Sequence, residues 1–301
     1  MACAGSETGA ADPTVTVIDW AVTRRALCRW HFSGALLPCG DVHKIAFHIG
    51  GLSIYWYGVC IAVGFLLALW TAARRAPRAG ISGERIADLG IWLMIGIVVG
   101  SRLFYVISHW ETEFAGQPLI ELLKLRQGGL VFYGGLVGGS LACVFAVRAK
   151  QLPLWKTADV LAPSIALGYV FGRLGCFTFG CCYGKACDLP WAVHFPNDHE
   201  TYPHGVHPTQ LYESLLSLGL YAGLAWLYRR KRFDGQVFAA YLIAYALLRF
   251  TMEFFRGDYA VRYLGGWATP AQLLSFVILG AGLVLWRYQA PRLAGAGPAR
   301  R

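Results

Sequence analysis

Residues 157–179, TADVLAPSIALGYVFGRLGCFTF, are long and apolar enough to cross a bilayer, yet they contain Arg173. A helix of about 20 predominantly apolar residues spans the hydrocarbon core. A charged guanidinium at membrane depth costs about 2.5–3.5 kcal/mol on insertion scales, so such a residue marks a functional site by default. Two further apolar stretches carry Arg102 and Arg249. The sequence therefore predicts a membrane protein with three intramembrane arginines.

The composition indicates several membrane crossings rather than a soluble domain or a single anchor. Of the 301 residues, 56% are hydrophobic and only 15% are charged. These fractions are too apolar for an ordinary soluble domain. Windows of about 20 apolar residues predict an all-α, polytopic integral membrane protein with seven transmembrane helices. The expected spans are 52–73, 86–109, 130–149, 157–179, 209–228, 236–256 and 269–288.

The net charge of +10 is distributed in a way that predicts the orientation of these spans. Fifteen lysines and arginines lie in alternate loops and the C-terminal tail, whereas the opposite loops hold five. Because cytoplasmic loops carry the excess of positive charge, we expect the C-terminus in the cytoplasm and the start of the first span outside. Membrane topology thus explains the basic charge, and no nucleic-acid partner is expected. The basic segments are 74–85, 148–156, 229–232 and 287–301.

The chain divides into three expected parts. Residues 1–51 form an N-terminal extension of uncertain structure, which has no clean apolar core of a signal peptide and receives no function. Residues 52–290 form the seven-helix transmembrane domain, and 291–301 form a basic cytoplasmic tail.

Polar side chains from six of the predicted helices fall at one depth. Spans two, four and six run outward and carry their arginines a few residues beyond the span midpoint. At about 1.5 Å per residue, this places the guanidinium groups in the outer half of the bilayer. Spans one, three and five run inward and carry their polar residues near their start, which lies in the same outer half. These residues are Tyr57, Tyr133, Gln210 and Glu213. A site at this depth would meet lipid headgroups.

Glycines in spans three and four predict close helix packing. Gly134 and Gly138 form one small-xxx-small pair, a spacing that lets helix backbones approach closely. In span four, Gly172 and Gly175 flank Arg173, where missing side chains could also admit a ligand headgroup. Both interpretations, packing and ligand access, remain open.

Arg249, Glu253 and Arg256 are spaced i, i+4, i+7 and are therefore expected on one helix face. An ion pair of Arg249 with Glu253 would neutralise the arginine in the membrane, and it could also position Arg249 for an anionic substrate. A guanidinium binds phosphate bidentately and stays charged at any relevant pH.

Five motifs, in order, resemble the bacterial prolipoprotein diacylglyceryl transferase family. The most specific is HPTQLYE at 207–213. GRLG at 172–175, followed by Gly180 and YGK at 183–185, resembles the signature of that family. The remaining motifs are WYG at 56–58, GLVFYGG at 129–135 and RFTMEFFR at 249–256. The resemblance covers roughly residues 50–290.

The resemblance implies an inner-membrane enzyme, multi-pass and expected to be a monomer. Such enzymes transfer the diacylglyceryl group of phosphatidylglycerol to the lipobox cysteine of a prolipoprotein, forming a thioether and releasing glycerol phosphate. The expected partners are phosphatidylglycerol, the prolipoprotein signal peptide with its lipobox, and membrane lipids. We expect no cofactor and no resident metal ion.

The resemblance also assigns roles to individual residues. Arg173 and Arg249 would clamp phosphate, Glu253 would orient Arg249, and Tyr57 would line the lipid site. Tyr133 is the remaining candidate for the catalytic group. Further substrate-binding candidates are Gly175, Gly184, His207, Gln210, Glu213 and Arg256.

Three positions depart from the pattern of the family. Tyr133 stands where a histidine is expected, and Cys176 and Cys181 stand where asparagine and glutamate are expected. A tyrosine, with an ordinary pKa of about 10, is a poorer base at neutral pH than histidine at about 6.5. These changes motivate an alternative function, that of a non-enzymatic relative binding anionic lipid or a lipoprotein. A transporter is less favoured, because the two halves of the chain do not repeat.

The four cysteines at 176, 181, 182 and 187 read C-x4-C-C-x4-C near the expected outer face. Oxidising conditions there could allow a disulfide. Zinc sites favour pairs separated by two to four residues, so the spacing only approaches that pattern. The thiols could instead be small buried hydrophobic groups. The sequence leaves these alternatives open.

Overall fold

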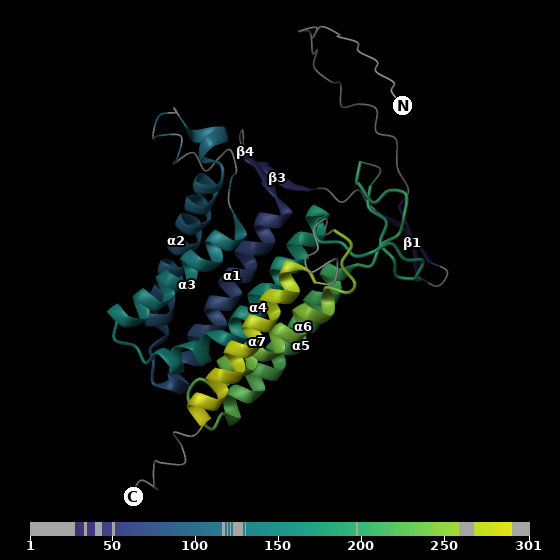
Figure 1. The fold of residues 1–301 in the computed structure, drawn as a ribbon. Coiled ribbons are helices and arrows are strands. Elements are labelled where there is room, and N and C mark those ends of the chain that lie inside the picture. The colour runs from purple at the N-terminus through teal and green to yellow at the C-terminus, as the bar shows by residue number, and fades with distance from the viewer. Residues whose placement is uncertain are drawn as a thin grey trace, which may run out of the picture.

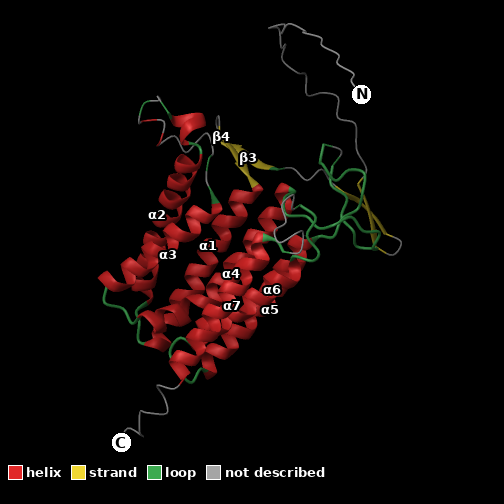
Figure 2. Cartoon of the chain, viewed as in Figure 1, coloured by secondary structure: helices red, strands yellow, loops and turns green. Residues whose placement is uncertain are grey.

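Helices dominate the computed structural model of the chain (Figures 1 and 2). The structure describes residues 28–32, 35–39, 44–49, 52–115, 118, 120, 122, 129, 131–196, 198–258 and 268–290. Within them, the α-helices are α1 (Trp56–Arg75), α2 (Gly83–Ser108), α3 (Phe132–Ala149), α4 (Leu154–Phe179), α5 (Thr209–Arg230), α6 (Gln236–Met252) and α7 (Pro270–Gln289). Each of them corresponds to one predicted span. Short helical turns follow α1 and α2: η1 (Ala76–Ala79) and η2 (Trp110–Phe114).

The N-terminal side contains four short strands, of which the last lies where the first predicted span was expected to begin. Strands β1 (Cys28–Phe32) and β2 (Ala35–Cys39) pair in one antiparallel hairpin, and β3 (Ile45–Ile49) and β4 (Leu52–Tyr55) pair in another. The first span was expected from residue 52, but Leu52–Tyr55 is extended and the helix begins at Trp56. Hydropathy alone does not distinguish a short apolar strand from the first turn of a helix. The hairpin β3–β4 leads directly into α1 (Figure 2).

Helix α1 lies between two groups of helices (Figure 1). It packs against α2, whose main partner is α3, and against α4. Helix α4 packs in turn against α5 and α6, and α6 packs against α7. The seven polar candidates, carried by six helices, thus come to one end of the bundle, because α2, α4 and α6 end where α1, α3 and α5 begin (Figure 1).

Glycines bring α2 and α3 into backbone contact. A Cβ atom added to Gly138 would collide with the carbonyl oxygen of Gly96, and one added to Gly100 would collide with that of Gly134. Only residues without a side chain permit this approach, which confirms the packing predicted from the small-xxx-small spacing in span three.

Several of these helices suit a bilayer by length and composition. Four segments in the described part of the chain are long and apolar enough to cross it: Trp56–Ala79, Gly83–Ser108, Leu154–Phe179 and Pro270–Gln289. Two shorter apolar helices are Tyr133–Ala149 and Gln236–Met252. Many large apolar side chains on these helices are exposed, including Leu66 at 62% and Val277 at 68%. Such surfaces are expected of a membrane protein.

Basic and aromatic side chains pair at the end of the bundle opposite the polar candidates, where α1 and α5 end. The guanidinium of Arg74 lies 4.1 Å from the centre of the Trp70 ring at the end of α1, and that of Arg230 lies 4.7 Å from the centre of the Trp226 ring at the end of α5. Tryptophan and arginine side chains are enriched at membrane–water interfaces.

A fully buried carboxylate, Asp159 of α4, organises this basic end. It accepts hydrogen bonds from the backbone N–H groups of Gly235 (2.9 Å), Val237 (2.9 Å) and Phe238 (3.0 Å) at the start of α6. Its Oδ2 also lies 2.9 Å from Nζ of Lys231. Asp159 therefore caps α6 and ties it to α4 and to the end of α5.

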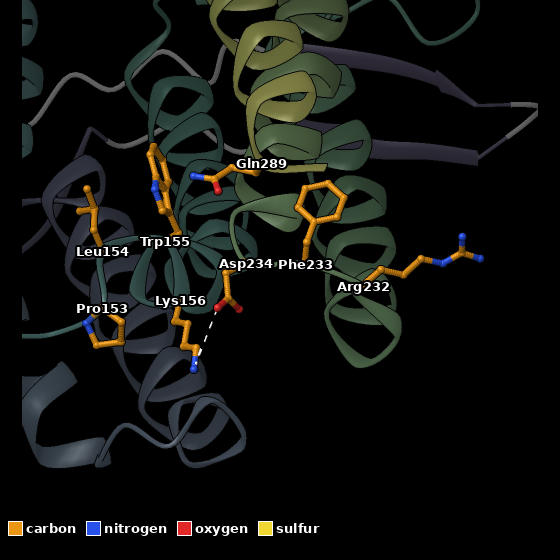
Figure 3. A pocket seen from close by; sticks show the side chains of 8 residues that line it. All are labelled: Pro153, Leu154, Trp155, Lys156, Arg232, Phe233, Asp234 and Gln289. Atoms are coloured by element: carbon orange, nitrogen blue, oxygen red, sulfur yellow. Dashed lines mark ion pairs between the residues drawn. The ribbon is translucent and has the colours of Figure 1, made fainter. Parts of the chain in front are cut away.

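A hollow of about 560 Å³ lies beside this cap (Figure 3). Its lining includes Lys156 and Asp234, which face each other at 4.0 Å, and the side chains of Trp155 and Phe233. Lys156 is 17 residues before Arg173 on α4, a distance of about 25 Å along a helix. The hollow is thus separate from the polar candidates and plays no part in their arrangement.

Candidate active site

Arg173, near the end of α4, is the centre of a buried polar group. Its Nε donates a hydrogen bond of 2.8 Å to the hydroxyl oxygen of Tyr169, one turn earlier on the same helix. The Tyr169 hydroxyl donates to Oε2 of Glu213 on α5, and this Oε2 also lies 2.5 Å from Nε of Arg173. The Glu213 side chain is 1% exposed and that of Arg173 is 12% exposed. Two residues that were predicted at the same depth, the arginine of span four and the early acid of span five, are therefore in direct contact.

Tyr169 was absent from the predicted site, although the sequence contains the signal that could have revealed it. Residues i and i+4 share one face of a helix, so a tyrosine four positions before a buried arginine is placed to contact it. Its ring also meets the Tyr245 ring of α6 edge to face, with centroids 5.6 Å apart. Tyr169 thereby connects Arg173 to both α5 and α6.

Arg249 and Glu253 form the predicted ion pair at the end of α6, with Nη1 and Oε2 2.5 Å apart. The prediction that Arg256 shares their helix face was wrong, because α6 ends at Met252. Arg256 instead lies in an extended segment bridged to Gly184, and its guanidinium binds Asp258 with Nε–Oδ1 and Nη2–Oδ2 distances of 2.9 and 2.6 Å. Turns at residues 253–255 carry the chain out of the helix before the third position is reached.

Gly184 and His207 join the loop after α4 to the start of α5. The N–H of Gly184 donates to the carbonyl oxygen of His207, and the N–H of His207 donates to that of Lys185. A Cβ atom on Gly184 would lie 2.5 Å from Cβ of His207 and 2.9 Å from the carbonyl oxygen of Phe255. The backbone of three segments meets here, and only glycine fits.

The first turn of α5 holds this loop in place. The Thr209 hydroxyl donates to the carbonyl oxygen of Cys182, and Nε2 of Gln210 donates to that of Cys181, both at 2.7 Å. Gln210 is completely buried, and its Oε1 has no hydrogen-bond partner among the described residues. The motif at 207–213 thus positions the loop as well as contributing Glu213.

Tyr57 lies at the start of α1, against the end of α4. A Cβ atom on Gly175 would lie 3.1 Å from Cδ2 of Tyr57, and the rings of Tyr57 and Phe179 are 6.1 Å apart. Tyr57 is still 42% exposed. It therefore forms one edge of the group around Arg173.

The motif-bearing segments thus meet at one end of the bundle, and they match a known family. The model of prolipoprotein diacylglyceryl transferase matches residues 44–288. The chain belongs to this family.

Its relatives in the family are similar over most of their length. A protein of Synechococcus elongatus named phosphatidylglycerol–prolipoprotein diacylglyceryl transferase is 38% identical over 256 residues, which are 81% of this chain and 87% of the relative. Proteins of the same name from Finegoldia magna and Nitratidesulfovibrio vulgaris are each 36% identical, over 243 and 271 residues. These matches cover 80% and 88% of this chain, and 94% and 100% of the relatives.

Two further candidates are carried by α2 and α3, which contribute no residue to the contacts of Arg173 described above. Tyr133 is in the first turn of α3 and is 53% exposed. Arg102 of α2 donates from Nε to the carbonyl oxygen of Leu122 at 2.9 Å and from Nη1 to that of Gly129 at 3.3 Å. Arg102 therefore fastens the connection between α2 and α3, in agreement with a structural role.

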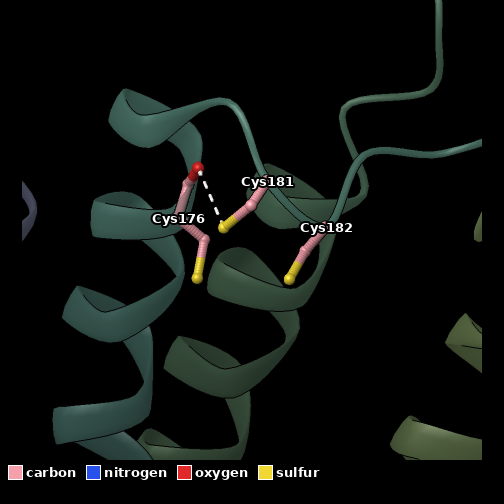
Figure 4. A group of neighbouring side chains, drawn as sticks. All are labelled: Cys176, Cys181 and Cys182. Carbon is pink, nitrogen blue, oxygen red and sulfur yellow. Dashed lines mark hydrogen bonds between the residues drawn. The ribbon is translucent and has the colours of Figure 1, made fainter. Parts of the chain in front are cut away.

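Three cysteines lie close together beside Arg173. The sulfur atoms of Cys176, Cys181 and Cys182 all lie within 4.8 Å of one another (Figure 4). Hydrogen bonds from the thiols of Cys176 and Cys181 lower the pKa of Cys182, and the positive charges of Arg256 and Arg173 act in the same direction. Cys176 and Cys181 occupy the positions where the resemblance led us to expect asparagine and glutamate.

Proposed function

We propose that this chain transfers the diacylglyceryl group of phosphatidylglycerol to the lipobox cysteine of a prolipoprotein, forming a thioether and releasing glycerol phosphate. The observation that carries the proposal is the buried group in which Arg173 and Glu213, from two family motifs on two helices, meet Tyr169. The names of the relatives support the same reaction.

The first task of the enzyme is to bind the anionic phosphodiester. Arg173 uses Nε and Nη2 to contact Tyr169. A guanidinium has five N–H donors in a planar fork, so it can hold a neighbouring group and a phosphate together. Arg249, oriented by Glu253, supplies the second positive charge. The paired carboxylates hold both arginines in place, which reduces the free-energy cost of ordering them when lipid binds.

The remaining binding candidates surround this charge. Tyr57 and Gly175 line the side of the site next to α1, where the lipid would enter. Oε1 of Gln210, which has no hydrogen-bond partner among the described residues, would accept a hydrogen bond from a hydroxyl of the glycerol headgroup. His207, Gly184 and Arg256 join the loop after α4 to the start of α5 and to the segment after α6.

The chemical step forms a carbon–sulfur bond and breaks a carbon–oxygen bond. The acceptor thiol loses its proton, the sulfur attacks the terminal glycerol carbon of the diacylglyceryl group, and the phosphate leaves with the bonding pair. Negative charge grows on the departing phosphate, and preorganised arginines stabilise it there. Tyr133 is the protein group proposed to assist the thiol proton, at the position of the expected histidine.

The proposal includes seven membrane spans in an inner membrane, with the start of α1 outside and the C-terminus in the cytoplasm. The charge distribution of the loops supports this orientation. The interfacial Arg–Trp pairs at the ends of α1 and α5 also support it. The group around Arg173 then faces the outer leaflet, where phosphatidylglycerol and an exported prolipoprotein are both accessible. Residues 52–290 would act as one monomeric domain.

Purified protein tests the activity directly. It is incubated with phosphatidylglycerol vesicles and a lipobox peptide, and glycerol phosphate and the mass of the peptide are measured. We expect glycerol phosphate in equal amount to diacylglyceryl peptide, and neither product with a peptide whose cysteine is replaced by serine. Lipid binding without either product, from protein that also fails to lipidate a reporter lipoprotein in depleted cells, would favour the non-enzymatic alternative.

A further inference from the structure

The cysteine cluster is a chemical group that the proposed transfer does not use. Cys176 lies in the last turn of α4, and Cys181 and Cys182 follow the end of that helix. All three are free thiols of intermediate burial, so small ions can reach them. Figure 4 shows the three sulfur atoms gathered on one side of the loop.

The spacing of the sulfur atoms suits a metal ion. An ion with metal–sulfur bonds of about 2.3 Å separates its sulfur ligands by about 3.8–4.0 Å. The sulfurs here lie within 4.8 Å of one another, so small side-chain rotations would complete the coordination. Thiolates are soft ligands and select Zn²⁺ or Cu⁺ over magnesium or calcium.

The backbone holds the thiols together before any ion binds. Cys182 has a φ of +64°, a left-handed conformation that is uncommon for residues other than glycine. The hydrogen bonds from Thr209 and Gln210 pin the carbonyl groups of both loop cysteines, and the N–H of Cys181 bonds to the carbonyl oxygen of Cys176 at 3.2 Å. Strained conformations of this kind cluster at functional sites, and fixed ligands lower the cost of binding an ion.

We propose that Cys176, Cys181 and Cys182 bind one Zn²⁺ ion and leave its fourth coordination position open. Three protein ligands with an open fourth position are the arrangement of catalytic zinc sites. Two departures from the expected family motifs occur together in this sequence. Two cysteines replace the expected asparagine and glutamate, and Tyr133 replaces the expected histidine.

The open position fits the acceptor substrate, an inference that rests on the proposed function. Zinc binds a thiol as thiolate, so the lipobox cysteine would release its proton to solvent when its sulfur coordinates the ion. That sulfur then attacks the glycerol carbon, the bond from carbon to phosphate oxygen breaks, and the thioether formed is a weaker ligand that can leave. Arg173 and Tyr57 lie within electrostatic range of the cysteines, so thiolate and phosphate would meet at one place.

Metal binding is tested without reference to activity. The purified full chain in detergent is reduced, dialysed against Zn²⁺ and analysed for metal content, and Co²⁺ is titrated as a spectroscopic probe. We expect one ion per chain and a thiolate-to-cobalt charge-transfer band. Cys176→Ser, Cys181→Ser and Cys182→Ser should each lower the affinity about 100-fold or more, beyond the 10–100-fold typical of losing an outer-shell partner.

Cys187→Ser is the matched control, because Cys187 is a free thiol of the same loop outside the cluster. It should bind both ions like the unchanged protein. Absence of the charge-transfer band, or its loss in Cys187→Ser, would overturn the site. A disulfide joining two of the three cysteines, found by alkylation and mass measurement without reductant, would also overturn it.

The role in thiol capture is tested by transfer assays with and without metal. We expect a chelator to lower the transfer rate about 100-fold, the lower range of what an activated nucleophile contributes, and Zn²⁺ to restore it. Normal transfer by protein shown to be metal-free would refute thiol capture and leave the proposed function intact. Absence of transfer under both conditions would refute the proposed function itself.

Discussion

Replacing the buried carboxylate of Asp159 should destabilise the protein more than any ordinary surface ion pair. The Asp159→Ala change removes an acceptor that serves three backbone N–H groups and Lys231. Loss of a helix cap costs about 1 kcal/mol, and removing one partner of a buried ion pair costs about 3–5 kcal/mol in all. With about 2–4 °C per kcal/mol for a domain of this size, we expect the unfolding midpoint to fall by roughly 6–20 °C.

The chain contains a matched control for this prediction. Asp88 forms an ion pair of 2.7 Å with Lys150, but its side chain is 52% exposed, whereas that of Asp159 is completely buried. Asp88→Ala should cost no more than about 1 kcal/mol, because exposed ion pairs contribute little. Asp159→Asn keeps one oxygen that can accept from the backbone N–H groups. Its unfolding midpoint should lie between those of Asp159→Ala and Asp88→Ala.

The assay is thermal unfolding of each variant in the same detergent, followed by tryptophan fluorescence. Burial alone would lower the pKa of Lys231, but its bonds to Asp159 and Asp234 raise it, so the lysine stays charged at the neutral pH of the assay. An Asp159→Ala midpoint no lower than that of Asp88→Ala would refute the reasoning, because burial would then not determine the cost.

Four further predictions concern the site and its support. Arg173→Lys should lower the transfer rate by about 100-fold in a glycerol phosphate release assay, because lysine keeps the charge but not the planar fork. Tyr169→Phe removes the hydroxyl between Arg173 and Glu213, and should lower the same rate by about tenfold, with a folded protein by circular dichroism. Tyr133→His should raise transfer by metal-free protein about tenfold, and change it little when Zn²⁺ is bound, because imidazole is the better base. Gly100→Ala should lower the unfolding midpoint through a cost of about 1–3 kcal/mol of overpacking between α2 and α3.

Each of these predictions has an outcome that contradicts it. Unchanged turnover in the Arg173 or Tyr169 variant would show that guanidinium geometry is unimportant. A Tyr133→His gain that is equally large with and without Zn²⁺ would separate that position from the metal. Gly219 offers the control for Gly100, because an added Cβ there would meet no atom of the described residues within 4 Å beyond the nearby backbone of its own helix. A Gly219→Ala midpoint as low as that of Gly100→Ala would contradict the packing argument.

The sequence predicted the helices well because membrane spans produce a strong and continuous signal. The prediction of 157–179 compares with Leu154–Phe179, and that of 269–288 with Pro270–Gln289. The predicted boundaries were wrong where a hydropathy window continued beyond the end of the observed helix. Residues 253–255 are turns, Arg256 lies in an extended segment, and residues 52–55 are a strand, yet the hydropathy windows included all of them in the predicted helices.

The site was predicted in its charged residues and less well in their connections. Arg173 and Glu213 are conspicuous because each is a charge within an apolar segment. Tyr169 and Asp159 were missed for different reasons. A tyrosine carries no charge that would make it conspicuous, and Asp159 lies at a helix start, where an acidic residue looks like an ordinary exposed one. The cysteines were recognised in the sequence, but their role was left open, because sequence spacing does not reveal the left-handed backbone of Cys182 or the distances between the sulfur atoms.

The Arg–Trp pairs at the ends of α1 and α5 imply that the enzyme is sensitive to bilayer thickness. Helix α1 has 20 residues and is about 30 Å long, with Trp56 at one end and Trp70 with Arg74 at the other. That length equals the hydrocarbon core of an average bilayer. Aromatic and basic anchors at both ends resist vertical displacement, so a thicker or thinner membrane must deform or tilt the helix. Acyl chain length would then control the height of Arg173 relative to the phosphate plane, and so the rate, without any change in headgroup chemistry.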